Sequence, residues 1–196
     1  MTMEAGKWYQ VGTPFVELSE GETPQLNTVF AKGFSDGDSI NIFDSTTSIY
    51  TPYYWKTSAG GWCTKRGTSP VAIDVPRGQA VFINKQVTGI VTLAGRVSVA
   101  EATTFGREEG DTWNQIVCVY PQALKLNDIK WTGITDGDAV SIYDSQTAVY
   151  APYYWKSSAG GWCTKRVSTP VNVEIPIGQA MFINKVSKGL GTCSAR

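Results

Sequence analysis

Histidine is missing from the 196-residue chain, and its absence limits the chemistry that the protein can perform. Histidine is the side chain that most often acts as a general base near neutral pH, and it is the commonest metal ligand. Without it, Ser-His-Asp triads, Cys-His pairs and the usual zinc sites are excluded or severely weakened. A carboxylate mechanism would need paired acids, and Glu17, Glu20, Glu22, Glu108 and Glu109 form no arrangement that recurs. We therefore expect a non-catalytic protein without a cofactor.

An excess of either charge is also missing, because 17 basic residues balance 17 acidic ones. Nucleic acids and anionic membranes attract proteins through a basic field, so neither is expected as a partner. No apolar run approaches the ~20 residues that span a bilayer, so we expect no membrane insertion. The start, MTMEAGKWYQ, has neither a basic region nor an apolar region, and no secretory signal is visible.

The chain contains two copies of one pattern, placed one after the other. The segments 53–66 and 153–166 differ only at Thr57 and Ser157. The flanking segments 33–50 and 70–85 align with 133–150 and 170–185, and Trp8 and Gln10 correspond to Trp113 and Gln115. A period near 100 residues is too long for a solenoid and indicates duplicated domains. We predict one domain over 1–96, a linker over 97–106 and a second domain over 107–196.

The pattern within each copy is typical of β-structure. SINIFD, VAIDV and AVFIN alternate in polarity, and DG, GG and PxG elements separate them. We predict a helical turn over Leu26–Ala31 and seven strands: Lys7–Pro14, Ser39–Asp44, Ser48–Lys56, Gly61–Arg66, Val71–Val75, Gln79–Asn84 and Ile90–Val97. The fold class is all-β, with two tandem, homologous antiparallel β-sandwich or partly open barrel domains. Because Gln79–Asn84 is apolar on both faces, it is predicted to be a central strand.

The repeated hairpin is rich in aromatic side chains on both faces. Strand alternation places Tyr53 and Trp55 on one face and Tyr54 and Lys56 on the other. One interpretation is that one set fills the core while the other pairs across strands. The alternatives are an interface or a platform on which sugars stack, since Tyr, Trp and Arg dominate interface energies. The candidate contact residues are Tyr53, Tyr54, Trp55, Trp62, Arg66, Tyr153, Tyr154, Trp155, Trp162 and Arg166.

Aspartates recur in the DGD segment of each copy. Asp36, Asp38, Asp136 and Asp138 are weak candidates for calcium ligands, because carboxylate oxygens suit this ion. A complete calcium-loop signature is absent, and an Asp-Gly pair before an alternating run more simply predicts a turn that enters a strand. We therefore predict no metal site.

Two of the four cysteines, Cys118 and Cys193, occur only in the second copy. Alignment places Cys118 in the opening strand and Cys193 in the closing strand, which can be neighbours in a sandwich. We predict a disulfide between them, which would imply an oxidising compartment. The alternative is that the cysteines are buried thiols that act as small apolar residues.

The order of motifs resembles a tandem β-module of predicted extracellular proteins in planctomycete and verrucomicrobial bacteria. The parts are an opening W-x5-P strand, a DGD turn, a GGW hairpin and a PxGQAxFINK strand, at Trp8–Pro14, Asp36–Asp38, Tyr53–Trp62 and Pro76–Lys85. The resemblance implies a secreted, non-catalytic module and no catalytic residue. It places the protein outside the cell or at its surface, with a virion or cytoplasmic assembly as alternatives because no export signal is visible.

The duplication suggests a structural protein that assembles with copies of itself. If one domain packs against the other, the same surfaces stay open at the two ends of the chain. Domain 2 of one copy can then meet domain 1 of the next, and such a head-to-tail contact builds a filament, a tube or a surface layer. The alternative is a bivalent carbohydrate-binding or adhesion module, whose partner would be a polysaccharide.

Overall fold

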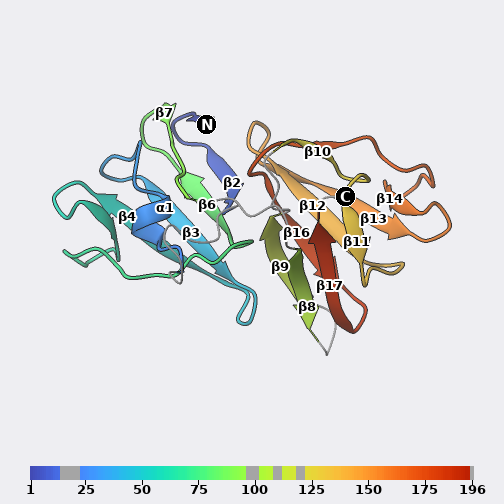
Figure 1. Ribbon diagram of the computed structural model, residues 1–196. Helices are drawn as coiled ribbons and strands as arrows, with labels where there is room; N and C mark the ends of the chain where they lie inside the picture. Colours follow the sequence, from blue (N-terminus) through green and yellow to red (C-terminus); the bar gives the residue numbers. More distant parts are fainter. Residues whose placement is uncertain (14–22, 96–101, 108–111, 118–121, 195–196) are drawn as a thin grey trace.

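The fold is all-β, as predicted, with antiparallel sheets that do not close into a barrel. A computed structural model describes residues 1–13, 23–95, 102–107, 112–117 and 122–194. Within these ranges, no helix is long and apolar enough to cross a membrane. Figure 1 shows two groups of strands side by side, one from each half of the chain.

Each repeat builds a five-stranded antiparallel sheet with the same strand order. The orders are β2-β6-β3-β4-β5 and β9-β16-β12-β13-β14. The first sheet contains β2 (Trp8–Gly12), β3 (Ser39–Asp44), β4 (Ile49–Lys56), β5 (Gly61–Cys63) and β6 (Ala80–Asn84). The second contains β9 (Thr112–Val117), β12 (Ala139–Asp144), β13 (Val149–Lys156), β14 (Gly161–Cys163) and β16 (Ala180–Lys185). The repeated sequence pattern thus produces a repeated sheet.

Short elements cover one face of each five-stranded sheet. In repeat 1 these are β1 (Thr2–Met3), α1 (Leu26–Val29) and β7 (Gly89–Ile90). In repeat 2 they are β8 (Thr103–Arg107), β10 (Leu124–Lys125), β11 (Lys130–Thr132), β15 (Glu174–Ile175) and β17 (Gly189–Ser194). Each repeat therefore has its own apolar core, and Trp62 and Trp162 lie in the two cores.

The strand predicted to be central occupies that position in both repeats. β6 pairs with β2 on one side and β3 on the other, and all five of its residues are buried. β16 pairs with β9 and β12 in the same way. Burial on both faces explains why these strands are apolar along nearly their whole length.

The near-identity of the two hairpins follows from packing in the core. Trp62 and Trp162 have no exposed surface, and each meets the preceding tryptophan edge-on, at 5.5 Å for Trp55–Trp62 and 5.4 Å for Trp155–Trp162. The indole N–H of Trp62 also donates a hydrogen bond to the carbonyl of Phe30 (2.7 Å). The interpretation that one face of the hairpin fills the core is therefore confirmed.

An asparagine closes the outer edge of each sheet. The side-chain oxygen of Asn27 accepts a hydrogen bond from the backbone N–H of Trp62 (2.6 Å), and its amide donates to the carbonyl of Val71 (2.6 Å). Asn127 makes the same two bonds to Trp162 (2.7 Å) and Val171 (2.8 Å). A Cβ on Gly61 would lie only 2.5 Å from the Asn27 oxygen, which explains the second glycine of the GGW motif. The edge strand is thereby protected from pairing with another chain.

Several predicted elements differ from the structure: the strand predicted over Gly61–Arg66 ends at Cys63, and Val71–Val75 and the linker differ more. Val71–Val75 alternates in burial as predicted but forms no continuous ladder, because its backbone groups bond in turn to Trp62, Leu26 and Pro24. The predicted linker 97–106 also differs. Its residues 103–106 lie in β8, where they pair with β17.

We predict that Asn27→Ala and Asn127→Ala each lower the free energy of unfolding by about 1–3 kcal/mol. Each change leaves a backbone N–H and a carbonyl without their partner, and this penalty sets the expected magnitude. Chemical denaturation measures the effect. Thr28→Ala, at an exposed neighbouring position, should change stability by no more than about 0.5 kcal/mol. If the asparagine variants are as stable as the Thr28 control, the asparagines do not hold the edges.

Candidate functional site

The five-stranded sheets each have a second, largely uncharged face that their own cores do not use. In β6, Val81 and Ile83 belong to the core of repeat 1, so alternation places Phe82 and Asn84 on the opposite face. The equivalent strand β16 places Met181 and Ile183 in its core and Phe182 on the opposite face. These second faces are where the two repeats meet.

Aromatic rings join the two repeats in a reciprocal manner. Phe43 of repeat 1 contacts Phe182 of repeat 2 edge-on, with ring centroids 5.1 Å apart. Tyr143, the equivalent of Phe43, contacts Phe82, the equivalent of Phe182, also at 5.1 Å. We call this contact region the two-fold interface; its aromatic residues are Trp8, Phe43, Tyr50, Phe82, Trp113, Tyr143, Tyr150 and Phe182.

The backbone follows the same reciprocal rule. Val11 forms a β-bridge with Gln179, and Ile116, the equivalent of Val11, forms one with Gln79. When residue i contacts j and the equivalent of j contacts the equivalent of i, the two units are related by a two-fold axis. The repeats are therefore arranged as in a symmetric dimer, although one chain carries both.

Equivalent residues meet each other where this axis passes. Gly12 and Val117 occupy equivalent places, opposite Ala80 and Ala180, and a Cβ on Gly12 would overlap the Val117 side chain. The phenols of Tyr50 and Tyr150 also interact with each other. The axis thus passes between the two members of the unlike pair Gly12–Val117 and between the two members of the identical pair Tyr50–Tyr150.

Two cavities at equivalent positions flank the axis. One has a volume of about 390 Å³ and is lined by Phe43, Ser48, Trp113, Ser141, Tyr150 and Phe182. The other, of about 260 Å³, is lined by Trp8, Asn41, Tyr50, Phe82, Tyr143 and Tyr150. Each cavity contains a tryptophan, a phenylalanine from the central strand and a short polar side chain from the neighbouring strand. Trp113 is 44% exposed and Tyr50 37% exposed, so a ligand can reach both cavities from solvent.

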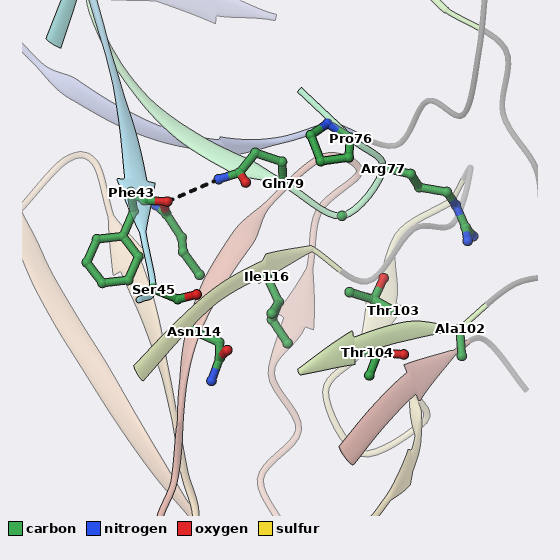
Figure 2. Close-up of a pocket in the computed structure, with 12 residues that line it drawn as sticks. Phe43, Ser45, Pro76, Arg77, Gln79, Ala102, Thr103, Thr104, Asn114 and Ile116 are labelled. Carbon is green, nitrogen blue, oxygen red and sulfur yellow. Dashed lines mark hydrogen bonds between the residues drawn. The ribbon is translucent and has the colours of Figure 1, made fainter. Parts of the chain in front are cut away.

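A third cavity, of about 430 Å³, lies between the 76–79 loop of repeat 1 and β8 and β9 of repeat 2 (Figure 2). Two of its polar side chains already form hydrogen bonds within the protein. The Gln79 amide donates to the carbonyls of Phe43 (3.5 Å) and Ala80 (2.9 Å), and the Thr103 hydroxyl donates to the Val117 carbonyl (2.8 Å). Phe43 is the only aromatic residue among those described in its lining, so this cavity suits a flat ring less well than the two aromatic ones.

The residues predicted to make external contacts are not brought together. Trp62 and Trp162 are fully buried in the two cores, so their side chains are not exposed for a contact outside the chain. Tyr53 is buried, while Tyr153, Trp55 and Trp155 are partly buried against their own cores. Tyr54 and Tyr154 are half-buried on the other face of the strand, and only Arg66 and Arg166 are exposed. In both sheets these hairpins lie at the end of the strand order opposite to β2 and β9.

The aspartates of the DGD segments hold turns. The Asp38 carboxylate, which is fully buried, accepts hydrogen bonds from the backbone of Ser35 (2.9 Å) and Gln86 (2.7 Å) and pairs with the Lys85 ammonium. Asp138 accepts bonds from Thr135 and Val186, with Lys185 at 3.9 Å.

The outer aspartates are engaged as well. Asp36 accepts a bond from the backbone of Thr57 (2.5 Å), and Asp136 accepts one from Ser157 (2.6 Å). Since N–H donors and a lysine occupy these oxygens, the turn interpretation accounts for the motif. No group of three or more potential metal-binding side chains occurs among the described residues.

The cysteine prediction falls partly on residues that the structure does not describe. Cys193 is buried on β17, whereas Cys118 lies outside the described residues. The Cys118–Cys193 disulfide therefore stays a prediction. Cys63 and Cys163 are buried thiols at equivalent places in β5 and β14.

Sequence reasoning did not select the residues of the two-fold interface. The available signal was the apolar second face of Gln79–Asn84, where Phe82 has no place in the core of its own repeat. This signal indicates that a face is covered, but it does not indicate what covers it. The matching residues Phe43 and Tyr143 lie in strands whose alternation looks like ordinary exposure on one side.

In comparisons with known proteins, no family model, no curated protein and no solved structure matched the chain. The functional argument therefore depends on the geometry described above.

We predict an alkaline dependence of stability from the tyrosines on the axis. Burial raises the pKa of the Tyr50 phenol to about 12, and it also raises the pKa of Tyr150. An unfolded tyrosine ionises near pH 10, so the unfolded chain loses these protons first and stability falls as the pH rises above about 10. Denaturation at several alkaline pH values measures this fall. Tyr50→Phe should make it shallower, and an unchanged pH dependence in this variant would contradict the buried contact.

Proposed function

We propose that this chain is a non-catalytic binding module that holds flat, uncharged rings in the two aromatic cavities of the two-fold interface. Sugar units of a neutral polysaccharide are the ligand class that fits this description. The observation that carries the proposal is the presence of two such cavities at equivalent positions, each open to solvent and each lined by a tryptophan.

The lining of the cavities favours an uncharged ligand. None of the residues that line either aromatic cavity carries a charge. A tryptophan face offers a flat apolar surface to the C–H face of a sugar ring, while Asn41 or Ser141 and the tyrosine phenols offer a few hydrogen bonds. Binding sites for small molecules commonly combine an apolar lining with a few polar groups in this way. The remaining ligand hydroxyls can stay in water because the cavities are open.

The absence of histidine from the sequence and of carboxylates from the cavity linings supports a non-catalytic role. Ser48 and Ser141 supply hydroxyl groups to the lining of the Trp113 cavity, but that lining contains no side chain that could act as a base. The arrangement supports binding rather than bond cleavage.

Two sites in one chain favour a polymeric ligand. Tyr150 lines both cavities, so they adjoin each other across the axis. Rings of one polysaccharide chain can then occupy both sites, and the second contact forms at a high effective concentration.

The expected head-to-tail filament has less geometric support than this binding role. That expectation required the faces that join the two repeats to be open at the ends of the chain. In the reciprocal arrangement both faces are used up inside one chain, and Asn27 and Asn127 close the outer edges of the sheets. An assembly of closed chains would have to use other surfaces.

We predict that Trp113→Ala lowers the apparent affinity for an immobilised neutral polysaccharide by roughly a hundredfold, the factor that a lost second site removes. Trp8→Ala should have a similar effect, and the double variant should abolish binding. A glycan array followed by pull-down on the insoluble polymer provides the measurement.

Val87→Ser is the control, because Val87 is exposed and lies in neither cavity. Denaturation curves of all variants separate lost binding from lost folding. Wild-type binding by a folded Trp8→Ala/Trp113→Ala variant would overturn the site, and a wild-type protein that binds none of the neutral glycans would overturn the ligand class.

A further inference from the structure

The pair at the axis, Gly12 and Val117, makes the two faces of the interface different. A Cβ at Gly12 would overlap all three side-chain carbons of Val117. Gly12 does not have a positive φ, so its backbone conformation does not require glycine. Its N–H donates a hydrogen bond to the carbonyl of Gly178 in repeat 2 (2.8 Å), which fixes the close approach. Glycine is therefore needed here for space.

This pair selects which faces can meet. When the second face of repeat 1 meets that of repeat 2, Val117 lies beside Gly12 and its side chain fills the space that the glycine leaves. Two repeat-2 faces would bring Val117 against a second Val117, and closely packed interfaces do not tolerate such an overlap. Two repeat-1 faces would leave a gap between two glycines. The remaining aromatic contacts are reciprocal and do not distinguish these pairings.

We propose that repeat 1 of one chain pairs with repeat 2 of a second copy through the two-fold interface, so that two chains exchange repeats. The partner is a second copy because the interface already joins two equivalent repeats and any copy carries both faces. The Gly12–Val117 pair ensures that exchange joins unlike repeats. Within one chain the tether favours the closed form, so exchange increases with protein concentration.

One feature of the face weakens the closed contact, and the charge of the chain permits a second copy to approach. Gln10 and Gln115 occupy equivalent positions, are buried, and have side-chain amides without a hydrogen-bond partner among the described residues. A buried amide without a partner weakens the contact that covers it. The formal charge of the chain is zero, so no net repulsion opposes the approach of a second copy. This inference does not depend on the ligand-binding proposal.

The test uses two full-length variants, Gly12→Val and Val117→Gly. In the first, two valines collide when the chain closes; in the second, a gap remains. When both variants are mixed, repeat 1 of the first fits repeat 2 of the second, and the two remaining faces form the wild-type pair. We expect a complex of twice the 21.3 kDa chain mass, with a dimer fraction at least about tenfold above that of either variant alone. Size-exclusion chromatography with light scattering measures it.

Three comparisons complete the experiment. The variants are also refolded together from denaturant, so that a chain which cannot close alone meets its partner while it folds. The double variant Gly12→Val/Val117→Gly should regain the wild-type melting temperature. Gly89→Val is the matched control, because a Cβ on this strand glycine meets nothing closer than 3.9 Å; it should not promote dimers in any mixture.

Each outcome decides the proposal. A dimer in the mixture and in the co-refolded sample supports it. Samples that stay at the single-chain mass, although the double variant is restored, would show that chains do not exchange repeats. A double variant that is no more stable than Gly12→Val would overturn the size match at the axis.

Discussion

The structure depends on one constraint: each five-stranded sheet carries large apolar side chains on both faces, so a single repeat cannot bury all of them. The face toward the repeat's own core is covered by the short elements of the same repeat, around Trp62 or Trp162. The second face carries Phe82 or Phe182, and the sheet of the other repeat covers it. Packing of one sheet on the other buries the apolar area of this face, and each Å² buried stabilises the fold by about 25 cal/mol. A repeat alone would leave that area exposed to water. The duplication therefore supplies the partner that the fold requires.

The manner of pairing decides what the duplication can do. A head-to-tail contact leaves one copy of each face open, and it favours open-ended growth. A reciprocal contact uses the same face on both repeats, so a closed chain has no such face left. The contacts Phe43–Phe182 and Tyr143–Phe82 are of the reciprocal kind. Growth of assemblies from this interface then requires the chain to open first, whereas the proposed binding role uses the two aromatic cavities, which are accessible in the closed chain.

Much of the fold could be predicted from local patterns, and the candidate site could not. Ser39–Asp44 was predicted with its observed bounds because alternation and an Asp-Gly turn specify such a strand locally. The hairpin was recognised and core filling was one interpretation of it, but Trp62 and Trp162 were also named as contact residues, since the sequence shows that they are repeated and not why. Both tryptophans fill a core, but their neighbours there differ between the copies: Phe34 packs on Trp62, while Trp131 packs on Trp162. Pairing between distant faces has no local sequence signal, so Trp8, Trp113 and Tyr143 were not selected.

The axis explains where the two repeats must differ. Away from it, a residue contacts a different residue of the other repeat, so both copies can keep the same side chains, as Phe82 and Phe182 do. On the axis a residue meets its own equivalent, and only a pair that fits itself can be identical. Two tyrosine phenols can interact with each other, so Tyr50 and Tyr150 are the same. Two valines on opposed strands cannot share one space, and the pair is Gly12 and Val117. This difference converts a symmetric surface into one that distinguishes the first repeat from the second.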